Sequence, residues 1–199
     1  MSDWALLGAV VKTQIHVDRM VTDGRYEDHK ILEVDELWLG PDGVIGQLGG
    51  QSLLHGHHRL HPNKTQGDRP REFRPNRLLS IGFTGHYAQM AERFGDAPIG
   101  CAAEDIIVDH DGTVPLERLS AGVQLRRDGQ VVELNGVAVA KPCVPFTKWL
   151  LRDQDADDAT VAPNRAFLED GMRGFVLGLA DQHEPVAIRV GDELWAANS

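Results

Sequence analysis

Cys143 is the residue of this sequence whose neighbours most clearly favour chemistry. It lies in the segment KPCVPFTK, residues 141–148, with one proline directly before it and another two positions after it. Prolines this close disfavour both a regular helix and a central strand, so we expect Cys143 in a rigid turn where a strand ends. Lys141 and Lys148 are near in sequence, and neighbouring cations favour the thiolate, the form that binds metals and attacks electrophiles. The alternative is a buried, inert thiol that packs as a small hydrophobic group, and the local sequence leaves both open.

Cys101, the second cysteine, has no feature of a reactive thiol around it. It lies in the segment PIGCAA, residues 98–103, without an adjacent cation, so we predict an inert, structural side chain. Two cysteines do not make the disulfide framework of a secreted protein, and no CxxC motif indicates a zinc ribbon or thioredoxin chemistry. We therefore expect both thiols to be free, in a reducing cytoplasm.

Four histidines form a second candidate site, within a long segment at residues 40–77 that is rich in Gly, Pro, His and Arg. They are His55, His57, His58 and His61. A His-x-His pair can chelate a transition metal. No cysteine or acidic ligand lies close to them in the sequence, and their spacing does not match HExxH. We therefore favour a solvated polar loop over a metal site.

The same segment carries a concentration of basic residues in an otherwise acidic protein. Long loops inside compact domains are usually functional or disordered, and the unusual side chains favour a functional loop. Arginine binds phosphate bidentately, so this loop could cradle a phosphorylated cofactor. Equally, the cations could be solvated and paired with the acidic excess. The residues are Lys64, Arg69, Arg71, Arg74 and Arg77.

The elements that must position these side chains are predicted to be mainly β-strands. Runs rich in Val, Ile and Leu are separated by turn residues. Asp128-Gly129 predicts a hairpin between two alternating runs, and Asn135-Gly136 predicts a second turn and hence a meander of three short strands. Helices are expected only at residues 84–94 and 163–172, with a solvated acidic loop at 153–158. The predicted strands are residues 6–17, 31–39, 105–108, 122–125, 131–134, 137–140, 175–179, 185–190 and 193–196.

Regular alternation of strands and helices is absent, so a doubly wound parallel sheet is not expected. The pattern predicts a mainly β protein, a barrel or closed sheet with a few peripheral helices. A length of 199 residues suggests one domain spanning residues 1–199. Hydrophobic residues make up 42% and charged residues 25%, which is typical of a globular chain rather than a disordered one.

Charge and missing motifs exclude several classes of protein. The net charge of −10, from 30 acidic and 20 basic residues, argues against sequence-independent nucleic-acid binding, which needs a basic surface. The first residues lack the positive charge of a signal peptide, and no stretch approaches the roughly 20 apolar residues that span a bilayer. We expect a cytoplasmic protein with no membrane partner. Walker, GxGxxG and GxSxG motifs are also absent from the sequence.

Several short motifs, taken in order, resemble the MOSC family, the C-terminal domain of molybdenum cofactor sulfurases. Residues 99–106 (IGCAAEDI) resemble the family's G-x-x-GEN-hydrophobic segment. Residues 119–123 (LSAGV) resemble the segment that leads into the next barrel strand. Residues 131–134 (VVEL), followed by 141–143 (KPC), resemble the strand that ends in the family's Pro-Cys.

The resemblance continues on both sides of this central part. Residues 170–175 (DGMRGF) and 190–192 (VGD) resemble the closing RG-aromatic and GD pair, and residues 43–46 (GVIG) resemble an early Gly-containing turn. Together the motifs cover residues 34–195. The succession of Pro-Cys, RG-aromatic and GD is the most specific part.

The chain departs from the family pattern at two points. The GEN motif reads AED at residues 103–105, so that only Glu104 matches, and Gln47 stands where an acidic residue is expected. The chain is identified as a divergent relative. The altered motif favours the alternative of a non-catalytic module whose pocket holds an anion.

The resemblance implies a barrel that binds the molybdenum cofactor (molybdopterin) through a thiolate. Cys143 would be the metal ligand and catalytic residue of a protein that reduces N-hydroxylated compounds, with a redox protein as partner. Alternatively, Cys143 would carry a persulfide between sulfur-donor and acceptor proteins. Pyridoxal phosphate is not expected, because it belongs to the desulfurase domain of larger sulfurases. The cofactor-binding residues that the resemblance implies are Lys64, Arg69, Arg71, Arg74, Arg77, Glu104, Lys141 and Arg173.

Overall fold

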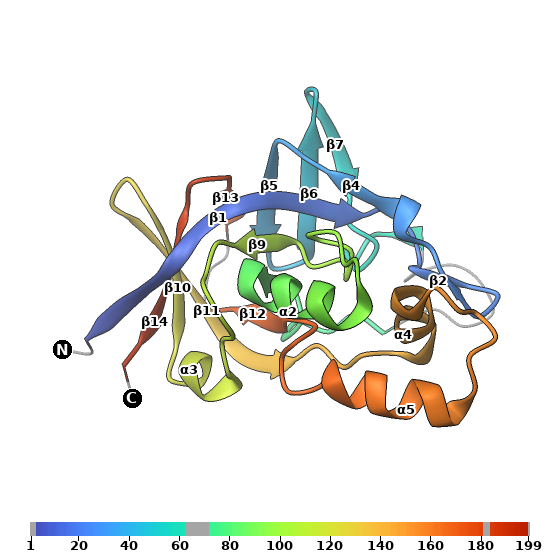
Figure 1. The fold of residues 1–199 in the computed structure, drawn as a ribbon. Coiled ribbons are helices and arrows are strands. Elements are labelled where there is room, and N and C mark those ends of the chain that lie inside the picture. The colour runs from blue at the N-terminus through green and yellow to red at the C-terminus, as the bar shows by residue number, and fades with distance from the viewer. Residues whose placement is uncertain (1–2, 63–71, 181–183, 199) are drawn as a thin grey trace.

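The main feature of the computed structural model, which describes residues 3–62, 72–180 and 184–198, is a closed β-barrel (Figure 1). Its strands follow the order β14-β10-β11-β12-β8-β9-β1, and pairing of β1 with β14 closes it. Neighbours are antiparallel except β8 and β9, which are parallel. The strands are β1 Trp4–His16, β8 Leu79–Phe83, β9 Ile106–Val108, β10 Val123–Arg127, β11 Gln130–Val139, β12 Phe175–Leu179 and β14 Glu193–Ala197. The predicted mainly β barrel with few helices is confirmed.

A second sheet, of order β13-β5-β6-β7, stands beside β1 (Figure 1). Its buried side chains belong to the same hydrophobic cluster as those of the barrel: Leu39 and Ile188 from this sheet cluster with Ile81 and Phe175. These strands are β5 Glu36–Gly40, β6 Gly43–Leu48, β7 Gln51–Leu54 and β13 Val186–Ile188. Further pieces are β4 Ile31–Glu33, which extends the pairing of β1, and the short hairpin of β2 Val21–Thr22 and β3 Arg25–Tyr26.

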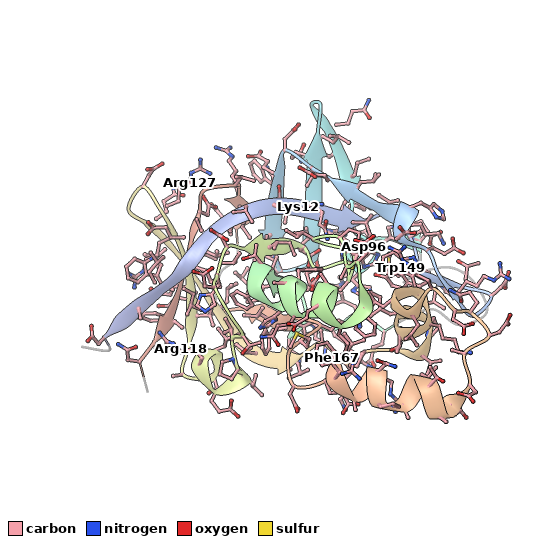
Figure 2. All side chains as sticks on the ribbon, in the orientation of Figure 1. Lys12, Asp96, Arg118, Arg127, Trp149 and Phe167 are labelled. Carbon is pink, nitrogen blue, oxygen red and sulfur yellow. The ribbon has the colours of Figure 1, made fainter. Side chains whose placement is uncertain are left out.

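Helix α2 lies in front of the barrel strands in this view, and α4 and α5 lie at the end opposite the two chain termini (Figure 1). Arg118 of α3 donates from Nη1 to the carbonyl of Ala197 (3.0 Å), and Phe167 of α5 packs on Phe94 of α2 with ring centroids 5.9 Å apart (Figure 2). Within the described ranges, no helix has the length and apolar character needed to cross a membrane. The helices in the described ranges are the 3₁₀ turn Asp28–Lys30, α2 Thr84–Phe94, α3 Leu116–Ser120, α4 Val144–Leu151 and α5 Asp158–Phe167.

The elements that local sequence signals predicted correctly include α2 and the hairpin at Asp128-Gly129. Helix α2 has the predicted bounds; it buries Tyr87 and Met90 and ends at Gly95, whose positive φ of 82° allows its N–H to cap the carbonyl of Ala91. The Asp128-Gly129 hairpin joins β10 to β11, and both turn residues have the positive φ that such a turn needs.

The second predicted turn is wrong, because Asn135-Gly136 lies inside the single strand β11. Pairing of β11 with β12 shifts register between Asn135 and Ala138, and Gly136 has a φ of +62°. Positive φ serves a β-bulge as well as a turn, so the same dipeptide lets the strand bend and continue. Similarly, predicted strand 31–39 divides into β4 and β5.

The helix predicted at 163–172 begins earlier in the structure, at Asp158. A further helix, α4, was not predicted. The side chain of Asp157 accepts a hydrogen bond from the N–H of Thr160 (2.8 Å), so α5 begins at Asp158 and Pro163 lies inside it. The predicted acidic loop therefore ends in a helix cap. Residues 144–151 form α4, because Pro145 lies in the first turn, where no backbone donor is required.

The segment 40–77 is not one long loop. Strands β6 and β7 occupy its first part, joined by a turn at Gly49-Gly50 in which both glycines have positive φ. The prediction failed because glycine was taken as a sign of a loop where it marks a hairpin.

Candidate functional site

A cavity of about 380 Å³ lies where strands β8, β11 and β12 meet the connections that lead into β9 and α4. This volume falls within the range of small-molecule sites, roughly 300–1,000 Å³. Its polar lining includes Cys143, Lys141, Arg77, Arg173, Glu104 and His16. Five of these six residues are positions that the family resemblance implied.

Cys143 is the residue directly before α4, in extended conformation with φ −108° and ψ 155°. Its carbonyl accepts hydrogen bonds from the N–H and the Oγ1 of Thr147, both at 3.1 Å. The strand exit expected for Cys143 is confirmed, since β11 ends four residues earlier. The side chain is half-buried and borders the cavity. Cys101 differs: its thiol is buried outside the cavity lining, and burial raises its pKa.

Arg173 is held against the same wall by three contacts. Its Nη1 donates to the carbonyl of Lys141 at 2.7 Å, Nη2 lies 3.5 Å from the carbonyl of Ala102, and the guanidinium carbon lies 5.2 Å from the ring centroid of Phe146. Its Nε is buried and makes no hydrogen bond within the described structure. Arg173 therefore fixes the turn before Cys143 and keeps one donor unused.

The other predicted cations divide into three groups. Arg77 and Lys141 line the cavity with Cys143. Arg74 is exposed and does not line it, and Lys148 points elsewhere, donating from Nζ to the carbonyl of Gln154 at 3.1 Å. The convergence of basic residues on Cys143 is therefore partial. Lys64, Arg69 and Arg71 lie outside the described residues.

Glu104 is buried at the base of the site. The hydroxyl of Tyr87 donates to Oε2 at 2.5 Å, while Oε1 is buried without a hydrogen-bond partner in the described structure. Burial raises the pKa of Glu104 to about 7, and the Tyr87 hydrogen bond partly opposes this shift. Gly82 leaves room for the carboxyl, because a Cβ there would lie 2.7 Å from Oε1.

Asp105 connects β8 to the histidines. Its Oδ2 accepts from the N–H of Ser80 (2.7 Å) and the Oγ of Ser80 (2.8 Å). Its Oδ1 lies 3.0 Å from Nε2 of His55, a distance that suits an ion pair, although the angle does not meet hydrogen-bond criteria. The two groups are both buried and close together.

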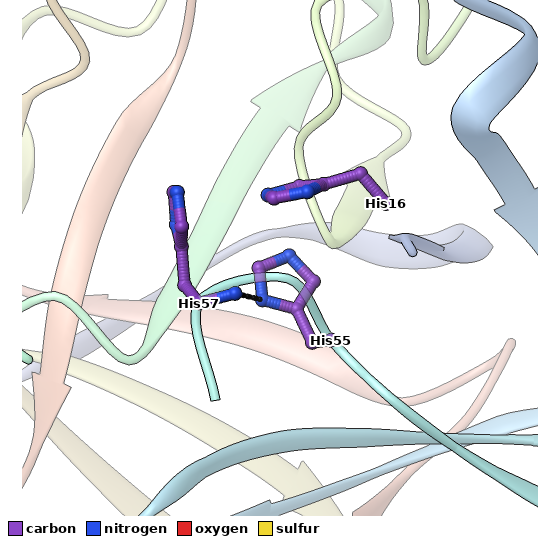
Figure 3. Close-up of side chains that lie close together, drawn as sticks. All are labelled: His16, His55 and His57. Carbon is purple, nitrogen blue, oxygen red and sulfur yellow. Dashed lines mark hydrogen bonds between the residues drawn. The ribbon is translucent and has the colours of Figure 1, made fainter. Parts of the chain in front are cut away.

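The solvated loop favoured for the histidines is wrong for most of them. His55, His58 and His61 are 3%, 4% and 9% exposed. His16, at the end of β1, joins His55 and His57, with ring centroids 4.1 and 4.6 Å from theirs (Figure 3). One ring nitrogen from each lies within 4.8 Å of the others. The sequence carried no local signal for this grouping, because His16 is far away along the chain.

The chain forms a closed barrel with a cavity at one end. No family model matches the sequence and no curated protein matches it. Among solved structures, the YuaD protein from Bacillus subtilis, which is MOSC-domain-like, matches with a TM-score of 0.60 and 16% identity over 100% of both chains. A hypothetical protein matches with a TM-score of 0.54 and 13% identity over 98% of this chain and 70% of that one. These similarities establish the fold.

Proposed function

We propose that this protein binds a molybdopterin-type molybdenum cofactor in the barrel-end cavity, with Sγ of Cys143 as a metal ligand. The observation that carries the proposal is that Cys143 shares one cavity with Arg77, Lys141 and Arg173. Thiolates are the soft ligands that the protein chain offers to such metals, and arginine and lysine bind phosphate. One cavity thus offers both of the groups that a metal-carrying phosphorylated pterin needs.

The residues present fit such a cofactor. Among the residues that the structure describes, the wall contains a buried donor without a hydrogen bond, Nε of Arg173, and a buried acceptor without one, Oε1 of Glu104. Buried polar groups are ordinarily paired, so unpaired ones beside a cavity favour a polar ligand that completes them. A pterin ring has donors and acceptors for both.

The reaction class we propose is reduction of an N-hydroxylated compound. When bound, the cofactor would supply the redox chemistry. Cleavage of an N–OH bond to N–H and water consumes two electrons and two protons, and the electrons would come from a redox protein. With its pKa near 7, Glu104 can release a proton at neutral pH, so we assign it as the protein's proton donor. Arg173 and Lys141 would hold the anionic part of the cofactor.

A second candidate function is that of a sulfur carrier, with a persulfide on Cys143. It is favoured by the partial exposure of Cys143, because transfer to another protein requires an accessible sulfur. In that role Cys143 would need no metal. The experiment below distinguishes the two candidates.

The test is the content of molybdenum and phosphorus in protein expressed in a host that makes the cofactor. We expect near-stoichiometric molybdenum in the wild type, its loss in Cys143→Ser and its retention in the matched control Cys101→Ala. Absence of both elements from the wild type would refute cofactor binding. Persulfide trapping on wild type and Cys143→Ser would then decide whether the protein is a sulfur carrier.

A further inference from the structure

Three histidines lie together on one wall of the cavity, although they come from separate parts of the chain. His16 ends β1, and His55 and His57 follow β7 (Figure 3). One ring nitrogen of each lies within 4.8 Å of the others. We infer that His16, His55 and His57 form a binding site for a divalent first-row transition metal ion of the zinc or iron(II) class. This site shares the cavity with the thiolate site proposed above but uses none of its ligands, so it does not depend on that proposal.

In two of the rings, an oxygen atom lies close to the nitrogen that would not bind the ion. Nδ1 of His16 donates to the carbonyl of Asp18 at 2.7 Å, so the lone pair of the neutral ring is on Nε2. Nε2 of His55 lies 3.0 Å from the carboxylate of Asp105, which Ser80 anchors. A carbonyl or carboxylate behind an imidazole fixes its tautomer and raises its basicity as a ligand.

The second contact leaves Nδ1 of His55 as its ligand atom. In the structure this atom accepts a hydrogen bond from the N–H of His57 at 3.1 Å. A metal ion would replace that donor, and the N–H of His57 would turn to water because His57 is exposed. Binding thus requires a local adjustment that includes the His57 backbone.

The backbone at residues 55–57 lies close to the end of β1, where His16 is located. The N–H of Gly56 donates to the carbonyl of His16 at 2.7 Å, which fastens the His-x-His segment to the end of β1. A Cβ at Gly56 would lie 2.6 Å from Nδ1 of His16. Glycine is therefore required between His55 and His57 for their rings to reach His16.

The coordination and charge of the site fit such an ion. Three imidazoles leave a fourth position open for water or substrate, the arrangement of catalytic rather than structural zinc sites. The carboxylate of Asp105 lies 3.0 Å from Nε2 of His55 and offsets part of the positive charge. His16 and His55 are buried, so an ion held there would be shielded on one side and would face the cavity on the other.

The test is titration of the full-length, chelator-treated protein with Co²⁺ and Zn²⁺ in the absence of any pterin cofactor. We expect one ion per chain, with Co²⁺ ligand-field absorption that Zn²⁺ abolishes. His57→Ala removes the exposed ligand and should weaken binding by about 10-fold or more, at least as much as loss of a supporting contact does. The matched control His29→Ala, an exposed histidine outside the cavity lining, should bind like the wild type.

Two further variants keep the proposal testable if a histidine substitution disturbs folding. Gly56→Ala removes no ligand but should also weaken binding, because it separates His16 from the other rings. Cys101→Ala should bind with unchanged affinity, because this thiol lies outside the cavity lining. No stoichiometric binding by the wild type, or equal affinity in wild type, His57→Ala and Gly56→Ala, would overturn the inference. Failure of molybdenum loading would leave these results unchanged.

Discussion

Ala103 has the backbone conformation of a glycine. Its φ is +64°, in the left-handed region, and it stands where the family motif GEN has its glycine. A left-handed alanine is destabilised by roughly 1–2 kcal/mol, while glycine loses about 0.5–1 kcal/mol more backbone entropy on folding. We therefore predict that Ala103→Gly stabilises the protein by up to about 1 kcal/mol, measured as the midpoint of denaturant unfolding.

The neighbouring alanine is the control for this substitution. Ala102 is buried without a positive φ, so Ala102→Gly should destabilise by about 1 kcal/mol or more through lost burial and entropy. If Ala103→Gly lowered the midpoint as much as Ala102→Gly does, strain at Ala103 would be disproved. The departure from GEN would then carry no energetic consequence.

Glu104 should make stability depend on pH. Burial raises its pKa from 4.5 to about 7, so between these values the native state keeps a proton that the unfolded chain releases. Stability from this group is complete below pH 4.5 and is lost as pH rises through 7. Glu104→Gln stays neutral, so it should gain stability relative to wild type with rising pH, by up to about 3 kcal/mol.

Unfolding free energies of both proteins across this pH window would check the prediction. A wild-type-minus-variant difference that did not change with pH would contradict it. The variant Tyr87→Phe gives a second test of the same pH dependence. The Tyr87 hydroxyl lowers the pKa of Glu104, so its removal should move the pH dependence to higher pH.

At the residue scale, short motifs contain several residues that the structure brings together. Cys143, Lys141 and Arg173 belong to the Pro-Cys and RG-aromatic motifs, and they line one cavity. His16 has no motif, because its meeting with His55 depends on how β1 and β7 end in space. Contacts between residues so far apart in the chain cannot be predicted from short sequence motifs.

At the scale of elements, Gly174 should be indispensable to the turn that enters β12. Its φ is +88°, and a Cβ there would lie 2.4 Å from the carbonyl oxygen of Ile81. Gly174→Ala combines backbone strain with a clash against an immobile backbone atom. We predict a loss of unfolding free energy clearly above the roughly 1–2 kcal/mol of strain alone.

Gly129 is the control that separates the cost of backbone strain from the cost of a steric clash. Its φ of +82° is similar, but nothing lies within 4 Å of its added Cβ, so Gly129→Ala should show the strain alone. Chemical denaturation of the two variants gives the comparison. Equal losses would show that the clash at Gly174 relaxes without penalty.

Helices and strands were predictable where the local sequence pattern is compatible with only one kind of element. The helix α2 and the Asp128-Gly129 hairpin are such cases. Asn135-Gly136 was predicted to form a turn, but its positive φ serves a β-bulge. Pro145 was expected to disfavour a helix, but it lies in the first turn of one. In both, packing of the neighbouring strands and helices selects between outcomes that the local sequence allows.

At the scale of the whole molecule, closure of the barrel depends on one long strand. β1 pairs with β14, β9 and β4 in turn, shifting register along its length. The strand content was predictable from composition and alternation, but this pairing order was not, because it joins residues from both ends of the chain. The parallel pairing of β8 and β9 was likewise invisible in the sequence.

The shared core of barrel and second sheet leads to a prediction of one cooperative unfolding transition. Leu194 in β14 and Leu39 in β5 are both fully buried in the same cluster. Leu194→Ala and Leu39→Ala should each destabilise by about 2–5 kcal/mol and shift the same single calorimetric transition. The control Val190→Ala, at a side chain 56% exposed, should change stability by no more than about 0.5 kcal/mol. Two transitions, each moved by only one of the leucine variants, would show instead that barrel and second sheet unfold separately and that residues 1–199 are not one domain.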